Sequence, residues 1–153
     1  MIDRATMVAI CAAEGISVAA TPKVKTIAIP DPAAGAELSY TVPSGVVLLV
    51  LSFYARFTAD VTAVNREPAL ALSDGTRTLS INQADRSVGA STGIILSWAD
   101  SIESDSNPPV SGRVRVALQT ALLLPGWAIG TETTNLQAGD QWSNVTIYCI
   151  EWS

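Results

Sequence analysis

The stretch LLLPGWAIGTETTNLQAGDQWSNVTIYCIEW, residues 122–152, decides the fold. Pro125-Gly126 and Gly139 are turn formers, because proline fixes φ and glycine accepts positive φ. They divide the stretch into short segments of alternating polarity, which is the pattern of β-strands. The last segment is apolar on both faces, one made of Val145, Ile147 and Cys149 and the other of Tyr148, Ile150 and Trp152.

The longest predicted strand, residues 46–57, repeats this two-sided pattern. Alternation assigns one set of side chains to the core: Val47, Leu49, Leu51, Phe53, Ala55 and Phe57. The opposite face is apolar only where the strand begins, at Val46, Leu48 and Val50. An antiparallel sheet usually exposes one face to water, so this half-strand predicts a second covering layer. That layer is either the N-terminal segment or a neighbouring subunit.

Further alternating segments predict the remaining strands. They cover residues 24–29, 37–42, 68–72, 76–81, 92–98 and 113–118. Ser73-Asp74-Gly75 predicts a hairpin between two of them. About eight short strands joined by turns, without helical crossovers, are typical of an antiparallel β-sandwich or jelly roll. We therefore expect an all-β, jelly-roll-like sandwich spanning residues 23–153.

Residues 1–22 form a separate N-terminal arm in this interpretation. Asp3 is a suitable helix cap, Met7, Ile10 and Cys11 share one helical face, and Gly15 is placed to end the helix. Residues 17–22 read as an extended linker. Because so short a helix is marginal in water by itself, it must dock on its own domain or on a neighbour, and the sequence leaves both open.

Composition excludes several functional classes. The 153 residues suffice for one domain, and the net charge of −5 with 9 basic residues argues against nucleic-acid binding. Acidic residues interrupt the apolar N-terminal run, so we expect no signal peptide and no membrane span. Histidine is absent, which removes the commonest general base and metal ligand. Cys11 and Cys149 lack CxxC spacing, so we expect free thiols rather than a disulfide.

No residue pattern indicates catalysis, a cofactor or a metal. Carboxylate pairs such as Glu132 with Asp140, or Glu103 with Asp105, have simpler roles in turns and loops. A calcium site at Asp100, Glu103 and Asp105 matches no EF-hand spacing, so a solvated acidic loop is favoured. Trp127 and Trp142 permit a carbohydrate platform, but their apolar neighbours favour packing in a core or an interface.

Four motifs together resemble small virion proteins of tailed bacteriophages. They are Tyr40-Thr41-Val42-Pro43-Ser44-Gly45, Asn65-Arg66, Leu124-Pro125-Gly126-Trp127 and the run from Thr133 to Trp142. The resemblance covers residues 24–152 and leaves out the N-terminal arm. It implies a β-sandwich structural protein of the particle without enzymatic activity, present in several copies and commonly trimeric. Such proteins include capsid decoration or cement proteins and components of the tail, collar or baseplate.

From this resemblance we expect a capsid decoration protein located in the virion and assembled in the host cytoplasm. It would stabilise the shell through self-association and through the arm, with the major capsid protein or other virion proteins as partners. A tail, collar or baseplate component with a carbohydrate-binding role in host adsorption is the alternative. The expected assembly interface contains Met7, Ile10, Cys11, Val46, Leu48, Val50, Tyr148, Ile150 and Trp152.

Overall fold

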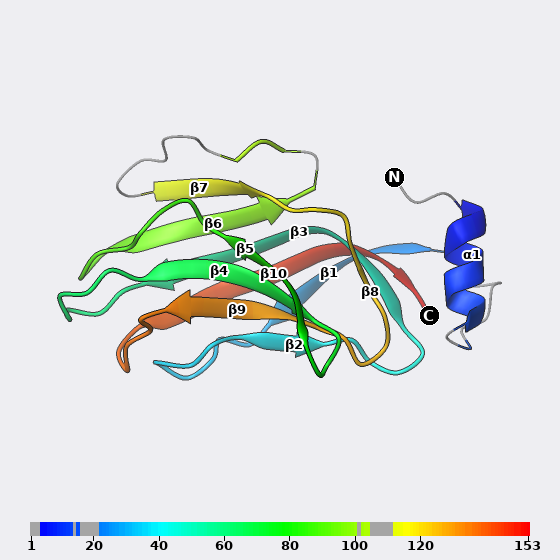
Figure 1. The fold of residues 1–153 in the computed structure, drawn as a ribbon, viewed down its shortest axis with the longest axis horizontal. Helices are drawn as coiled ribbons and strands as arrows, with labels where there is room; N and C mark the ends of the chain where they lie inside the picture. Colours follow the sequence, from blue (N-terminus) through cyan, green and yellow to red (C-terminus); the bar gives the residue numbers. More distant parts are fainter. Residues whose placement is uncertain (1–3, 14, 16–21, 101, 105–111) are drawn as a thin grey trace.

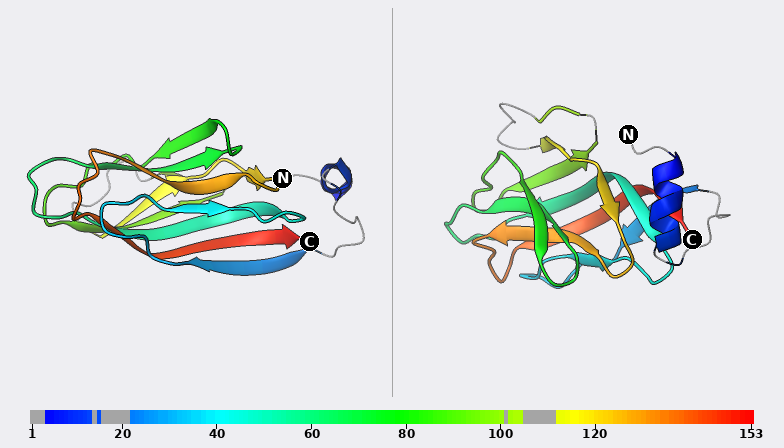
Figure 2. Two further views of the ribbon diagram at one scale, coloured as in Figure 1. Left: turned by 90° about the horizontal axis from the view of Figure 1, so that it is seen from below. Right: turned by 45° about the vertical axis from the view of Figure 1, so that its right-hand side comes forward.

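Two β-sheets pack face to face, and one helix lies beyond their end (Figure 1). The computed structural model describes residues 4–13, 15, 22–100, 102–104 and 112–153, which form one helix and ten strands. The view from below shows the two layers edge on, with α1 (Arg4–Ala13) outside both (Figure 2). The predicted all-β, sandwich-like fold with a short N-terminal helix is confirmed at this level.

The larger sheet has six strands. In pairing order they are β1 (Lys23–Ile29), β10 (Gln141–Trp152), β3 (Val47–Thr58), β6 (Gly93–Ala99) and β7 (Gly112–Ala117), with β8 (Ala121–Leu123) beside the beginning of β3. The smaller sheet contains, in order, β2 (Ser39–Thr41), β9 (Ala128–Thr134), β4 (Glu67–Ser73) and β5 (Thr78–Gln83). The hairpin predicted at Ser73-Asp74-Gly75 joins β4 to β5.

Aromatic side chains fill the space between the sheets. The rings of Phe53 and Trp98 meet edge to face with centroids 5.8 Å apart, and those of Phe57 and Trp142 are tilted at 4.8 Å. Both indole N–H groups are satisfied: Trp98 donates to the carbonyl of Asn82, and Trp142 donates to a carboxylate oxygen. Buried indoles usually need such partners, so these bonds fix the orientation of the rings in the core.

One strand pair departs from the predicted antiparallel arrangement. β6 and β7 run parallel, whereas every other named pair among the described strands is antiparallel. Residues 100–111 separate the two strands, and a connection of about a dozen residues is long enough to return the chain to the same end of the sheet. The sequence indicated a loop there but not the direction of the strand after it.

The predicted faces of β3 are wrong for the first half of the strand. Phe53, Ala55 and Phe57 do point into the core, but so do Leu48 and Val50, not Val47, Leu49 and Leu51. The register between β3 and β10 changes here: Tyr148 pairs with Ser52, whereas Cys149 pairs with Val50. Leu51 is therefore an extra residue in a β-bulge, and a bulge reverses the alternation on one side of itself.

Some predicted features cannot be placed. The cap Asp3, most of the linker (residues 17–21) and Asp105 of the acidic loop lie outside the described residues. Gly15, at a φ of +71°, does follow α1 as expected of a helix-ending glycine. Within the part of the chain that the structure describes, no helix is long and apolar enough to cross a membrane.

Candidate functional site

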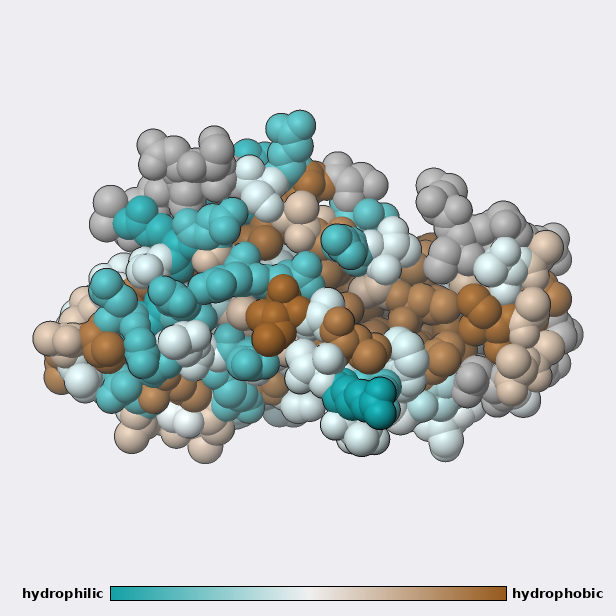
Figure 3. Space-filling view, in the orientation of Figure 1, coloured by the Kyte–Doolittle hydropathy of each residue, from teal (hydrophilic) through white to brown (hydrophobic). Residues whose placement is uncertain are grey.

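The helix α1 covers an apolar surface at one end of the sandwich. Met7 and Cys11 of α1 are buried against Val47, the first residue of β3. Ile10, Leu122, Leu124 and Trp152 pack around this group and are partly exposed. We call the four sandwich residues Val47, Leu122, Leu124 and Trp152 the end surface. The space-filling view shows apolar side chains gathered where α1 meets the sandwich (Figure 3).

Strand register explains how residues far apart in sequence form the end surface. Val47 pairs with Trp152 across β3 and β10, and directly opposed residues of an antiparallel pair point to the same face. Leu123, the last residue of β8, belongs to the main core, so alternation turns its neighbours Leu122 and Leu124 the other way. The end surface is therefore a direct consequence of strands that are apolar on both faces.

The side of α1 turned away from the sandwich is apolar as well. Ala5, Val8, Ala9 and Ala12 are exposed and recur at the i, i+3, i+4, i+7 spacing of one helical face. A helix at the surface of a globular protein normally places polar side chains there, and a helix apolar all round normally lies in an interior. The outer side of α1 therefore differs from an ordinary solvated helix face.

Both thiols are buried in the folded chain, and neither has the surroundings of a nucleophilic cysteine. Burial raises the pKa of Cys11 on the inner side of α1 and that of Cys149 in the core, in each case mainly through desolvation of the thiolate. A nucleophilic cysteine needs the opposite, a lowered pKa and access to solvent. Both cysteines are free, as the sequence predicts, and they serve as packing residues.

The structure brings together only some of the predicted interface residues. Met7, Ile10, Cys11 and Trp152 meet at the end surface. Tyr148 is 44% exposed on β10, and Ile150 is partly exposed next to it. Leu48 and Val50 are fully buried in the main core, and Val46 packs against that core, so none of these three lies on the end surface. The bulge at Leu51 is the physical reason for this correction.

Three residues of the end surface were missed by sequence reasoning. They are Val47, which was assigned to the core, and Leu122 and Leu124, which were read only as the end of a strand. The run of three leucines contained a usable signal, because consecutive side chains on a strand point to opposite faces and three leucines in a row therefore make both faces apolar. Such a strand, like β10, needs a packing partner on each of its two faces.

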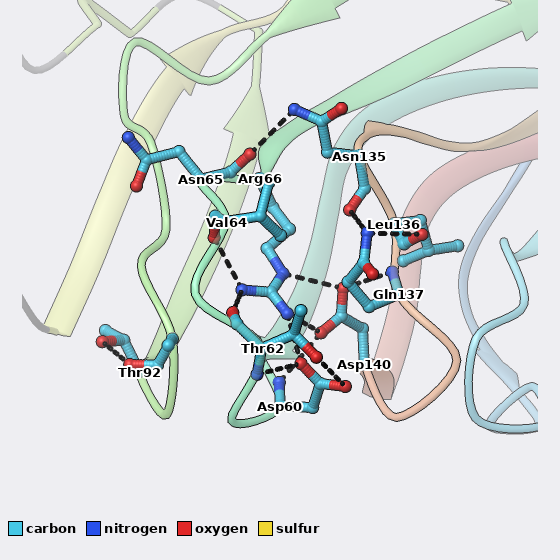
Figure 4. Close-up of polar contacts among 11 residues, drawn as sticks. Asp60, Thr62, Val64, Asn65, Arg66, Thr92, Asn135, Leu136, Gln137 and Asp140 are labelled. Atoms are coloured by element: carbon cyan, nitrogen blue, oxygen red, sulfur yellow. Dashed lines mark hydrogen bonds and ion pairs between the residues drawn. The ribbon is translucent and has the colours of Figure 1, made fainter.

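The opposite end of the sandwich is closed by a polar network instead (Figure 4). Arg66 is completely buried and donates from Nε to Asp140 at 3.0 Å and from Nη1 to the carbonyls of Thr62 and Val64 at 2.7 Å. Its Nη2 contacts Asp140 Oδ1 at 2.9 Å and also Asp60. Every N–H of the guanidinium therefore has a partner, which indicates a structural role.

Of the other candidate groups, Asp140 and Trp142 are likewise engaged or buried, whereas Glu103 and Glu132 are exposed. Asp140, half of one suggested catalytic pair, accepts hydrogen bonds from the backbone N–H groups of Asp60 and Gln137 besides Arg66. Trp142 is fully buried, so its ring is not available to a sugar, whereas Trp127 packs against the core and stays partly exposed. Among the described residues, no group of three or more His, Cys, Asp or Glu side chains gathers as a metal site.

The end surface is thus the site with the strongest physical case for binding a partner. Its chemistry is purely apolar, which suits a protein segment rather than a small polar ligand. Comparisons of this chain with protein-family models, with curated proteins and with solved structures gave no match.

Proposed function

We propose that this chain is a non-enzymatic structural protein of a tailed-phage particle, built as a jelly-roll-like sandwich and working as a capsid decoration protein. In this proposal it forms a homo-oligomer, a trimer, and its N-terminal arm helps to hold it on the shell. The support comes from the resemblance of four sequence motifs to small virion proteins and from the form of the molecule.

One observation carries the proposal: an apolar helix on its own connector is seated on an apolar end of an otherwise complete sandwich. A protein that is self-sufficient as a monomer has little use for such a helix with a second, exposed apolar side. A protein that assembles in many copies can use it as an attachment element. Weak contacts repeated over a symmetric shell then add to a stable attachment.

Locating the chain on the particle tests this function. Purified particles of the phage that encodes it would be labelled with an antibody against the chain and viewed by electron microscopy. Label spread over the shell supports a decoration protein, and label confined to the tail, collar or baseplate selects the alternative. If purified particles carry none of the chain, both virion roles are wrong.

The role of the arm is tested by attachment to shells that lack the chain. A variant without residues 1–22 is expected to lose attachment, and Met7→Asp to weaken it strongly, since a charge cannot enter the apolar contact. Thr6→Asp is the matched control, because Thr6 is exposed on the same helix outside both apolar sides. Circular dichroism must first show that the sandwich of each variant is folded. Attachment that is undiminished without the arm would contradict its role.

A further inference from the structure

We infer that α1 also binds the end surface of a second copy of this chain, so that neighbouring copies exchange their N-terminal helices. The inference deepens the proposed function, on whose self-association it rests, by naming the partner of the arm. The recognition chemistry is the contact already visible within one chain: Met7, Ile10 and Cys11 on the end surface. Since every copy presents the same surface, exchange requires no new contact there.

The contact between α1 and the sandwich is separable from the rest of the fold. Met7, Cys11 and Val47 form a buried cluster distinct from the main core between the sheets. This cluster has only three buried residues, and a helix of ten residues is marginal in isolation. We therefore expect α1 to detach from the end surface while the sandwich stays folded.

The connector permits the helix to reach a neighbour. Residues 14–22 join α1 to β1, and nine extended residues span at most about 30 Å. Because α1 lies beyond the end of both sheets, no part of the sandwich encloses it (Figure 2). A second copy placed end to end or side by side is thus within range of the released helix.

Crowding decides which copy the helix occupies. A tether of nine residues gives α1 an effective concentration in the millimolar range at its own end surface, so the chain's own helix prevails in dilute solution. Exchange becomes competitive when copies are held close together, as they are on a particle. The exposed side of α1 further favours association between copies. Its apolar side chains lose their contact with water only when another chain lies against them: Ala5, Val8, Ala9 and Ala12.

A mixed-disulfide experiment distinguishes the two arrangements. One variant carries Cys11→Ser with Val47→Cys, and it is mixed with the unchanged chain at total concentrations from about 10 μM to about 1 mM. After mild oxidation, only the helix of an unchanged chain seated on the variant can join Cys11 to the thiol introduced at position 47. The product migrates at twice the mass of one chain on a non-reducing gel.

Three controls make the result specific. Each chain incubated alone lacks one of the two thiols at the contact. Dimers formed in these incubations therefore measure the disulfides that arise from chance collisions. Cys149 is present in all chains and is fully buried, so it contributes equally to every lane. Val47→Cys alone reports the intramolecular contact, since it places both thiols in a single chain.

We expect the mixed product to rise with concentration while the intramolecular product of Val47→Cys alone falls. If the intramolecular product persists and no mixed product forms at about 1 mM, the inference is wrong. If neither disulfide forms, sedimentation at the same concentration decides. In that measurement the unchanged chain and the Thr6→Asp variant must sediment with a mass above that of one chain. The Met7→Asp variant must sediment as a single chain. Any other pattern overturns the exchange.

The outcome is independent of the location of the chain on a particle. Exchange by a chain that purified particles do not contain would uphold this inference and remove the virion function. Decoration of shells by a chain that never exchanges its helix would uphold the virion function and overturn this inference.

Discussion

Arg66 and Asp140 form a bidentate ion pair in which neither side chain is exposed, with Nε–Oδ2 at 3.0 Å and Nη2–Oδ1 at 2.9 Å. The pair joins the segment before β4 to the turn before β10, at the end of the sandwich far from α1 (Figure 1). The two ends of the molecule are therefore closed by opposite kinds of chemistry. The polar end is closed by residues of the sandwich itself, and the apolar end is closed by a helix that a connector joins to the sandwich.

Removing the arginine is expected to destabilise the fold severely. Arg66→Met leaves the buried Asp140 without its cation, and breaking a buried pair in this way costs about 3–5 kcal/mol. Urea unfolding followed by tryptophan fluorescence measures the change. Arg113→Met is the matched control, because Arg113 is exposed on β7. A loss for Arg66→Met no larger than that of the control would show that the network contributes little.

The double variant Arg66→Met with Asp140→Leu tests the cause of that loss. It removes both buried charges, so the unpaired carboxylate no longer exists. Replacing a whole buried ion pair by apolar side chains is often neutral. We therefore expect the double variant to be more stable than Arg66→Met alone. A double variant that is less stable than the single one would mean that the geometry of the hydrogen bonds, not the unpaired charge, dominates.

A tight approach between β9 and the segment before β2 makes a second prediction. A Cβ on Gly130 would lie 2.3 Å from the carbonyl oxygen of Leu38, which is backbone and cannot turn aside. Gly130→Ala is therefore expected to destabilise by about 1–3 kcal/mol or more, through overpacking. Gly89→Ala is the control, since nothing lies within 4 Å of its Cβ position. Equal melting temperatures for the two variants would contradict this packing.

Acid should lower the stability that the polar end gives to the fold, and the direction of this pH dependence follows from the pKa of Asp60. The pKa of Asp60 is lowered mainly by the backbone N–H of Thr62, with further help from the Thr62 hydroxyl and from Arg66. Ionised Asp60 therefore favours the folded state above the ordinary Asp pKa of about 3.9, and this contribution is lost as the pH falls through the lower folded value.

The unfolding midpoint in urea, measured between about pH 5 and about pH 2, tests this assignment. The unchanged chain should lose stability over that range, and Asp60→Asn should lose less of it because position 60 no longer titrates. Asp74→Asn provides a comparison, since the N–H groups of Arg77 and Thr76 lower the pKa of Asp74 at the distant hairpin. An unchanged slope in Asp60→Asn would remove Asp60 from the acid response.

Alternation predicted the strands well, but it could not assign the faces of β3. Where only one face is apolar, as in β7 with Val114 and Val116 buried and its arginines exposed, the pattern identifies the core side directly. In the first half of β3 both faces are apolar, so the pattern carries no information about which one is inside. A bulge at Leu51 then reverses the assignment, and no glycine or proline marks it.

The end surface was only partly predictable for a related reason. The helix face of Met7, Ile10 and Cys11 follows from spacing within a few residues. The surface it covers combines β3, β8 and β10, and their meeting depends on long-range register that local patterns do not encode. Likewise, Asn65-Arg66 and Asp140 were noticed as motifs, but their ion pair required the folded structure.

The two cysteines provide a direct measurement of helix detachment. Cys11 is covered only by the contact between α1 and the end surface, whereas Cys149 lies in the main core. In dilute solution a thiol reagent should therefore modify Cys11 much faster than Cys149.

Met7→Ser should speed labelling of Cys11 by roughly tenfold or more, because it removes about 1.5–3 kcal/mol of docking energy. The exposed neighbour Val8→Ser should leave both rates nearly unchanged. Equal acceleration of Cys11 and Cys149 by Met7→Ser would mean that α1 leaves the surface only when the whole sandwich unfolds, and exchange between folded copies would then lack its first step.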